Sequence, residues 1–313
     1  MEKRILFAVD GSDKCNEALR TAGELLKNHD GCHVLLYHCV PELQVFYPGE
    51  MMAPGSMEGY LERAGNAVLE ASHRVLSETG FPADRIAMKL KVDSVAPSCD
   101  ILDEAAASKI QTVICGRRGR TPKKNLLIGS TSSRLSQYST LRTVWVIDAP
   151  VHQTRRILIP MEGSPDSRAL TYYAAEFFAP IPDLSYTLLH FMPKLPPRFW
   201  DHGRILNDDE EKNKNRDLNE WRDGTLREVE KFLSEARDAL IGGGVPAEKV
   251  RTRIVHTKTD LAGDMLDEID RNQYQFVLIG KKSFKEQKPF LIGSNANKIL
   301  KNVRHTILCL VDS

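Results

Sequence analysis

The chain has 313 residues, of which 42% are hydrophobic and 27% are charged. This length suits two domains of about 150 residues each, and the composition is typical of globular proteins and excludes a disordered chain. Because 43 Lys and Arg balance 42 Asp and Glu, for a net charge of +1, global electrostatic attraction to nucleic acid or to an anionic membrane is excluded as well.

The predicted elements of the first half alternate between strand and helix. The apolar run 5–9 is typical of a parallel strand buried on both faces, and the helix after it has Ser12 or Asp13 as its N-cap. The other elements expected in this half are strands at 34–40, 86–92, 112–115 and 143–147 and helices around 60–75, 101–106 and 130–138. This alternation predicts an α/β fold with a doubly wound parallel sheet.

The second half of the chain repeats the first. The segment RILFAVDGS at 4–12 recurs as RILIPMEGS at 156–164, an offset of 152 residues that LLYHCVP and TLLHFMP share. Later pairs, such as TVWVID at 143–148 and ILCLVD at 307–312, are 164 residues apart. The second copy therefore has about twelve extra residues, expected in the polar stretch 200–220. We predict tandem domains at 1–149 and 154–313.

Neither a signal peptide nor a membrane span is expected. The run 5–9 ends at Asp10, which makes it too short for a signal-peptide core, and no stretch approaches the ~18 apolar residues of a membrane helix. The six cysteines show no C-x-x-C or zinc-binding spacing and no metal site is predicted. We therefore expect a cytoplasmic protein.

Three segments of the first half fall at carboxyl ends of predicted strands, where open α/β sheets bind ligands. They are 10–12, 40–41 and the loop that starts at Gly116. In that loop, Gly116 and Gly119 precede Gly129 and Ser130, which open the next helix. Glycines let the backbone approach a phosphate, and a helix N-terminus favours the negative charge of a phosphate.

The spacing G-x2-G-x9-G-S of this loop resembles the ATP-binding signature of the universal stress protein family. The strands that end in VDGS and LLYHCVP resemble the first two strands of that family, and the resemblance extends over both halves. It implies two tandem Rossmann-like domains of the adenine nucleotide alpha-hydrolase-like type. It also implies an adenine nucleotide as ligand, namely ATP, ADP or AMP, with or without Mg²⁺.

The resemblance assigns roles to residues of the first domain. The nucleoside would meet Ala8 and Asp10, and the adenine edge would meet the backbone of Val40. The ribose and the phosphates would be held by the residues of the glycine-rich loop and the helix after it, namely Cys115, Gly116, Gly119, Gly129, Ser130, Thr131 and Ser132. The basic side chains of that loop are either phosphate ligands or a solvated surface, and they are Arg117, Arg118, Arg120, Lys123 and Lys124.

The second domain departs from the family pattern. Glu162 replaces Asp10, Met192 stands at the position of Val40, and Ser283 replaces the second glycine, where a positive φ would be strained. Gly280, Gly293 and Ser294 are retained. A weakened second site is therefore possible in principle, but loss of nucleotide binding is the favoured prediction.

Other chemistry is weighed against structural explanations. His38 and His190 are expected to be structural, and the carboxylate pairs at 103–104 and 267–268 are assigned no chemistry. Cys115 is either a thiol activated by the nearby arginines or, as favoured, a buried packing residue.

We expect a regulatory adenine-nucleotide binder of the stress-response type. The alternatives are a slow ATPase or phosphotransferase, for which no general base is identifiable, and an interaction module without nucleotide. The apolar last strands of the two halves are expected to pair and form a pseudo-dimer, and chains are a candidate for homodimer formation. No catalytic residue, nucleic-acid partner or membrane partner is predicted.

Overall fold

The computed structural model describes residues 3–42, 56–119, 127–163, 165–194, 196, 199, 207–281 and 292–312. In the first half the helices and strands are β1 (Lys3–Val9), α1 (Asp13–Leu26), β2 (Cys32–Pro41), α2 (Ser56–Glu78), β3 (Ile86–Ser94), α3 (Pro97–Ala107), β4 (Thr112–Gly116), α4 (Ser130–Tyr138) and β5 (Thr143–Ile147). In the second half they are β6 (Arg156–Pro160), α5 (Pro165–Phe178), β7 (Ser185–Met192), α6 (Asp208–Gly242), β8 (Val250–His256), α7 (Leu261–Asn272), β9 (Phe276–Gly280), α8 (Ser294–Asn302) and β10 (Ile307–Val311).

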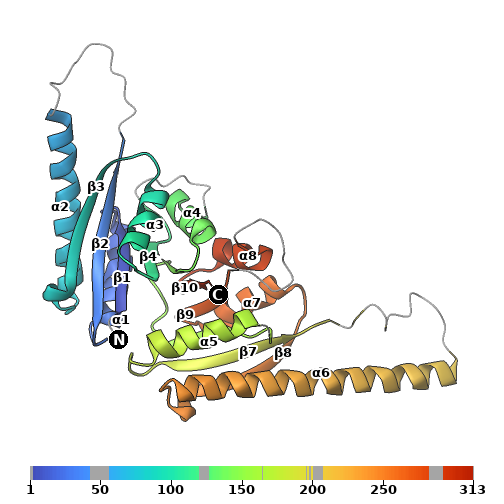
Figure 1. The fold of residues 1–313 in the computed structure, drawn as a ribbon. Helices are drawn as coiled ribbons and strands as arrows, with labels where there is room; N and C mark the ends of the chain where they lie inside the picture. Colours follow the sequence, from blue (N-terminus) through green and yellow to red (C-terminus); the bar gives the residue numbers. More distant parts are fainter. Residues whose placement is uncertain are drawn as a thin grey trace, which may run out of the picture.

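The strands form one ten-stranded sheet that runs through both halves (Figure 1), in the order β3-β2-β1-β4-β5-β10-β9-β6-β7-β8. The order of the second half mirrors that of the first. Neighbouring strands are parallel within each half, whereas β5 and β10 pair antiparallel, with Ile147 opposite Ile307 and Val144 opposite Leu310. The predicted pairing of the last strands is therefore present, and each strand covers the edge of the other.

Helices cover both faces of the sheet, as a doubly wound fold requires. Helices α1, α2, α5 and α6 pack on one face, where the core includes Trp145 and Phe276. Helices α3, α4, α7 and α8 pack on the other face, where Val146 and Leu308 are buried. Alternate residues of β5 and β10 thus belong to two separate cores, because successive side chains of a strand point to opposite faces. The predicted fold class is confirmed.

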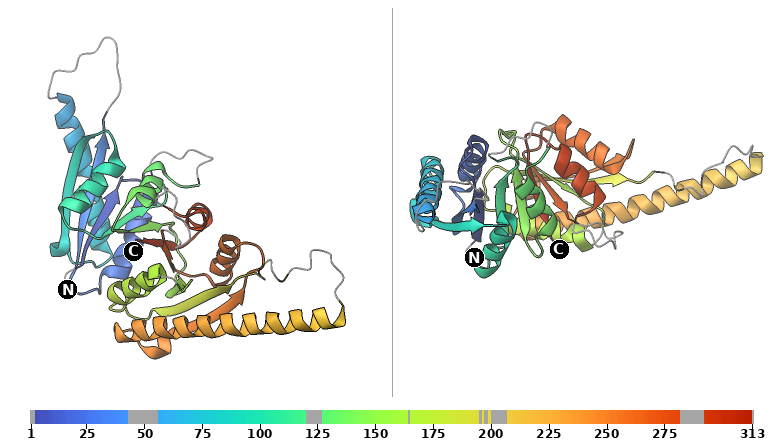
Figure 2. Two further views of the ribbon diagram at one scale, coloured as in Figure 1. Left: turned by 45° about the vertical axis from the view of Figure 1, so that its right-hand side comes forward. Right: turned by 90° about the horizontal axis from the view of Figure 1, so that it is seen from above.

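The extra residues of the second copy lengthen a helix. Helix α2 has 23 residues, whereas its repeat α6 has 35. The starts of the two helices are 152 residues apart and their ends 164 apart, so the insertion lies within α6 and adds ~18 Å to it. The first turns of α6 reach well beyond the rest of the molecule (Figures 1 and 2). A capping box of Asn207 and Glu210 starts the helix.

Candidate functional site

The structure brings the predicted residues of the first domain together at the carboxyl ends of three strands. Ala8 in β1 lies beside Cys115 in β4, and β2, which contains Val40, flanks β1 on its other side. Asp10 directly follows β1, and Gly116 is the last residue of β4. Since β1 pairs with both β2 and β4, its end is the place where ligands bind in folds of this class.

The carboxylate of Asp10 is fixed by the turn that starts α1. Its Oδ1 accepts hydrogen bonds from the Ser12 N–H at 2.9 Å and from the Ser12 hydroxyl at 2.7 Å. The Ser12 hydroxyl also caps the helix, because it accepts a hydrogen bond from the Cys15 N–H at 3.2 Å. One serine therefore both starts α1 and orients the acidic group at the site.

Gly119 packs against this carboxylate. A Cβ atom on Gly119 would lie only 2.1 Å from Asp10 Oδ2, far inside van der Waals contact. The φ of Gly119 lies outside the left-handed region, so the requirement for glycine is steric and does not come from a positive φ. The sequence left open whether this position needs a positive φ, and in the structure it does not.

The N-terminus of α4 lies on the other side of the loop. Its N-cap is Gly129, which has no side chain to pair with the N–H groups of the first turn. The Gly129 N–H donates to the Arg117 carbonyl at 2.9 Å, and the Ser132 hydroxyl donates to the Gly116 carbonyl at 2.7 Å. Ser130 is exposed and Thr131 is half-buried. These contacts join both ends of the loop and leave the positive end of the α4 dipole directed toward the site.

Two arginines of the loop differ in burial. Arg118 is exposed, whereas Arg117 is only 2% exposed. The Arg117 side chain donates to the Leu127 carbonyl at 2.9 Å and to the Lys301 carbonyl at 2.6 Å. Burial lowers the pKa of Arg117 to about 10, which still leaves it charged at neutral pH. The Arg117 side chain is therefore held by backbone carbonyls of both domains, and these donors are not directed to phosphate. Arg120, Lys123 and Lys124 lie outside the described residues.

Cys115 is a buried packing residue. Burial raises the pKa of the Cys115 thiol to about 12, and its Sγ donates to the Trp145 carbonyl at 3.6 Å. Activation of this thiol by the arginines of the loop, the alternative raised by the sequence, is therefore contradicted.

This assignment predicts which thiols react. In the native protein, iodoacetamide at pH 8 is expected to alkylate Cys99, which is exposed, and to leave Cys115 unmodified, because alkylation requires an accessible thiolate. Peptide mass spectrometry distinguishes the two sites, and denatured protein serves as the control in which both react. Alkylation of native Cys115 as fast as that of Cys99 would contradict its burial.

The second domain repeats the backbone of the site but not its surroundings. Gly280 ends β9, Gly293 is the N-cap of α8, and Ser294 opens that helix. The Met192 carbonyl, at the position assigned to the adenine edge, accepts hydrogen bonds from the Thr257 N–H at 3.2 Å and from its hydroxyl at 2.7 Å. Glu162 is exposed. Ser283 lies outside the described residues.

The second domain also differs from the first by an aromatic ring near its site, a difference that the sequence repeat did not indicate. The Phe232 ring of α6 lies beside Gly163, because a Cβ atom added to Gly163 would come within 2.8 Å of the ring. The centroid of the Phe232 ring is 5.2 Å from that of the His190 ring. The position equivalent to Phe232 in α2 is Val68. A bulky ring therefore stands beside the turn that follows β6.

The histidines and carboxylates that the sequence pattern left without a chemical role have structural partners. Nδ1 of His38 and Nδ1 of His190 each lie 2.7 Å from the carbonyl oxygen of the residue that matches in the repeat, Val9 and Met161 respectively. Glu104 pairs with Lys89, and Glu268 pairs with Arg253. No cluster of potential metal ligands occurs among the described residues.

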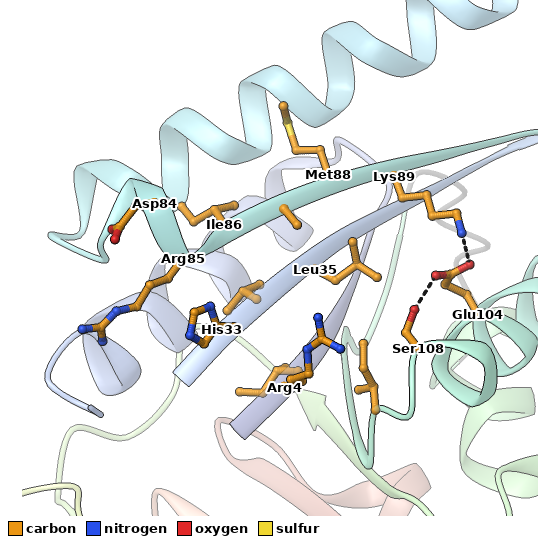
Figure 3. Close-up of a pocket in the computed structure, with 14 residues that line it drawn as sticks. Arg4, His33, Leu35, Asp84, Arg85, Ile86, Met88, Lys89, Glu104 and Ser108 are labelled. Atoms are coloured by element: carbon orange, nitrogen blue, oxygen red, sulfur yellow. Dashed lines mark hydrogen bonds and ion pairs between the residues drawn. The ribbon is translucent and has the colours of Figure 1, made fainter. Parts of the chain in front are cut away.

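A cavity of about 390 Å³ lies in the first domain at the amino ends of its strands, opposite the candidate nucleotide site (Figure 3). It is lined by residues near the amino ends of β1, β2 and β3, including Arg4 and His33. Figure 3 shows Lys89 and Ser108 directed toward Glu104, which they bind at 2.6 Å and 2.7 Å. Because it is far from Asp10 along β1, this cavity is separate from the candidate nucleotide site.

Two curated relatives of this chain are universal stress proteins. A universal stress protein of Mycolicibacterium smegmatis is 27% identical over 176 residues, which are 55% of this chain and 58% of that protein. The universal stress protein YxiE of Bacillus subtilis is 26% identical over 147 residues, 45% of this chain and 95% of YxiE. The chain thus spans little more than half of the first relative. A further solved family member, similar to 47% of this chain with a TM-score of 0.34, is a complex with cAMP.

The fold of the whole chain also has a solved counterpart. The crystal structure of a universal stress protein from Archaeoglobus fulgidus superposes with a TM-score of 0.63, covering 99% of this chain and 98% of that one at 13% identity. Among the residues that the structure describes, no helix has the length and hydrophobicity needed to cross a membrane. The sequence pattern of the universal stress protein family matches residues 1–147 and again 153–310. The chain therefore belongs to the universal stress protein family and contains the family domain twice.

Proposed function

We propose that the first domain binds an adenine nucleotide, ATP or its products ADP and AMP, and that the protein is a regulatory binding module of a stress response. The observation that carries the proposal is the placement of a fixed carboxylate, a loop glycine without a side chain and an uncapped helix N-terminus at the carboxyl ends of the neighbouring strands β1 and β4. These are the groups of Asp10, Gly119 and α4. A carboxylate accepts hydrogen bonds from nucleoside hydroxyls, and a helix N-terminus binds phosphate.

The remaining first-domain residues complete the proposed site. Val40 offers its backbone to the adenine edge, and Ser130 and Thr131 offer N–H groups and hydroxyls to the phosphates. Ser132 takes part through its backbone, since its hydroxyl donates to the Gly116 carbonyl. Arg118, exposed beside Gly119, supplies charge to the phosphates. Mg²⁺ would enter this site bound to the phosphates of the nucleotide.

The second domain is proposed not to bind nucleotide. Its Met192 carbonyl is already hydrogen-bonded by Thr257, so the backbone contact proposed for the adenine edge is occupied. Phe232 stands beside the turn after β6, where the first domain has a smaller side chain. A cytoplasmic location and association into a homodimer stay predictions from the sequence.

A count of bound nucleotides tests the proposal. The purified protein is denatured, and the released nucleotides are identified and counted by chromatography and mass spectrometry, before and after incubation with ATP. We expect about one adenine nucleotide per chain, since one of the two sites is intact. Two per chain would contradict the assignment of the second domain. No adenine nucleotide, even after incubation with ATP, would overturn the proposal and favour an interaction module.

A further inference from the structure

Arg117 and Lys281 occupy equivalent positions in the two domains, directly after the glycine that ends β4 or β9. Both side chains are only 2% exposed. The backbone of each residue holds the start of the helix in its own domain. The Arg117 carbonyl accepts the N–H of Gly129 at 2.9 Å, and the Lys281 carbonyl accepts the N–H of Gly293 at 2.6 Å.

The side chains of these two residues cross to the other domain. The Lys281 ammonium group donates to the Ser139 carbonyl at 2.6 Å, to the Ser139 hydroxyl and to the Arg142 carbonyl at 2.9 Å. Ser139 is the C-cap of α4. In the reverse direction, Arg117 donates to the carbonyl of Lys301, in the last turn of α8, at 2.6 Å.

The chemistry of these contacts fixes the ends of the helices. The last carbonyls of a helix lack intrahelical partners and carry its negative dipole, so a cation is a favourable neighbour. An ammonium group has three donors, and Lys281 donates to the Ser139 carbonyl, the Ser139 hydroxyl and the Arg142 carbonyl. Because a buried ammonium is costly to leave unpaired, Lys281 resists any displacement of Ser139 and Arg142.

Helix α4 is therefore held at both ends, by different domains. The loop of the first domain holds its N-terminus through Gly129 and Ser132, whereas the second domain holds its C-terminus through Lys281. The N-terminus is the proposed phosphate site, and α4 has only nine residues. A short, rigid helix transmits a shift at one end to the other end.

We infer that Lys281 of the second domain is a positioning residue for the nucleotide site of the first domain. It acts by fixing α4, so the second domain contributes to nucleotide binding although its own site has diverged. This inference rests on the proposed function, since it concerns the affinity of that site. If Lys281 has this role, the pairing of the two domains is required for tight nucleotide binding in the first domain as well as for folding.

The variant Lys281→Met tests this role in the full-length chain. Methionine is also unbranched and only one atom shorter than lysine, but it donates no hydrogen bond to Ser139. We expect the affinity for ATP, measured by titration calorimetry after bound nucleotide is removed, to fall about tenfold, within the usual range of coupling between sites. Lys281→Arg, which retains donors, is expected to recover most of the affinity. Hydrogen exchange without nucleotide should be faster in α4 of the methionine variant.

Tyr173→Phe is the matched control. The Tyr173 hydroxyl accepts a hydrogen bond from the Trp145 indole N–H at 2.9 Å and lies 3.2 Å from the Thr112 hydroxyl. The variant thus also removes a contact between domains, but on the sheet face away from α4. We expect its affinity for ATP and its α4 exchange to match the wild type within about twofold.

The outcomes separate this inference from the proposed function. An unchanged affinity in Lys281→Met, or an equal loss in Tyr173→Phe, overturns the positioning role. If Lys281→Met does not fold, Ser139→Ala removes one acceptor of Lys281 instead. This variant should lower the affinity for ATP and speed hydrogen exchange in α4. No change in either quantity overturns the positioning role of Lys281. If the wild type does not bind ATP, the proposed function fails. Hydrogen exchange tests the role of Lys281 independently of ATP: unchanged exchange in α4 of Lys281→Met would show that Lys281 does not fix this helix.

Discussion

Trp145→Ala is expected to lower the free energy of unfolding by about 4 kcal/mol, the usual scale for deleting a fully buried large aromatic side chain. Trp145 in β5 is 0% exposed, and its aromatic neighbours belong to the second domain. Its ring stacks on Phe178 at 5.3 Å and meets Phe177 and Phe276 at 4.9 Å and 6.0 Å. Its indole N–H also donates to the Tyr173 hydroxyl.

The loss should weaken both domains together, because one side chain of the first fills the core of the second. Trp221→Ala is the matched control, since Trp221 in α6 is half-buried and its ring lies 5.8 Å from that of Phe199. We expect it to cost about 1 kcal/mol. Urea denaturation followed by circular dichroism measures both values. A cost for Trp145→Ala no greater than that for Trp221→Ala would contradict the shared core.

The periodic parts of the fold could be predicted from the sequence. The last strand of the first half was predicted at 143–147 and the helix before it at 130–138, and the structure has both with these bounds. Continuous apolar runs and a glycine N-cap specify such elements locally. The repeat offsets also gave the size of the insertion, because α6 absorbs the difference between 152 and 164 residues, and the predicted stretch 200–220 overlaps the first part of this helix.

The direction of side chains in the loop could not be predicted in this way. Arg117 follows a glycine in a basic loop, and that local pattern is typical of a phosphate ligand. Its carbonyl acceptor Lys301 is 184 positions away, and the two residues meet where the pairing of β5 with β10 brings the two domains together. The equivalence of Arg117 and Lys281 in the repeat was a usable signal, because two cations at one interface position indicate a shared structural role.

The steric constraint at Gly119 was hidden for a similar reason. Local sequence suggests that a loop glycine serves backbone conformation. Here the restricting atom is Oδ2 of Asp10, which comes from a strand end more than 100 residues earlier in the chain. The same holds for Phe232, which contacts the turn after β6 from the C-terminal half of a long polar helix. Contacts of this kind depend on the tertiary fold and leave no periodic pattern.

Gly119→Val is expected to abolish tight binding of ATP. The new Cβ would lie 2.1 Å from Asp10 Oδ2, and the Asp10 carboxylate cannot yield cheaply because Ser12 holds its Oδ1 through two hydrogen bonds. Either Asp10 leaves the nucleoside position or the loop moves away from α4. Loss of about two charge-assisted contacts, ~3 kcal/mol in total, corresponds to a ~100-fold lower affinity.

Gly224→Val provides the control, because a Cβ at Gly224 in α6 meets no atom within 4 Å. Its affinity for ATP should equal that of the wild type, and thermal unfolding of both variants verifies that each is folded. Titration calorimetry on nucleotide-free protein gives the two affinities. If Gly119→Val is folded and still binds ATP like the control, the nucleotide does not occupy the space between Asp10 and α4. The carboxylate, the loop and the helix N-terminus would then be a structural junction, and the ligand site would have to be sought elsewhere in the chain.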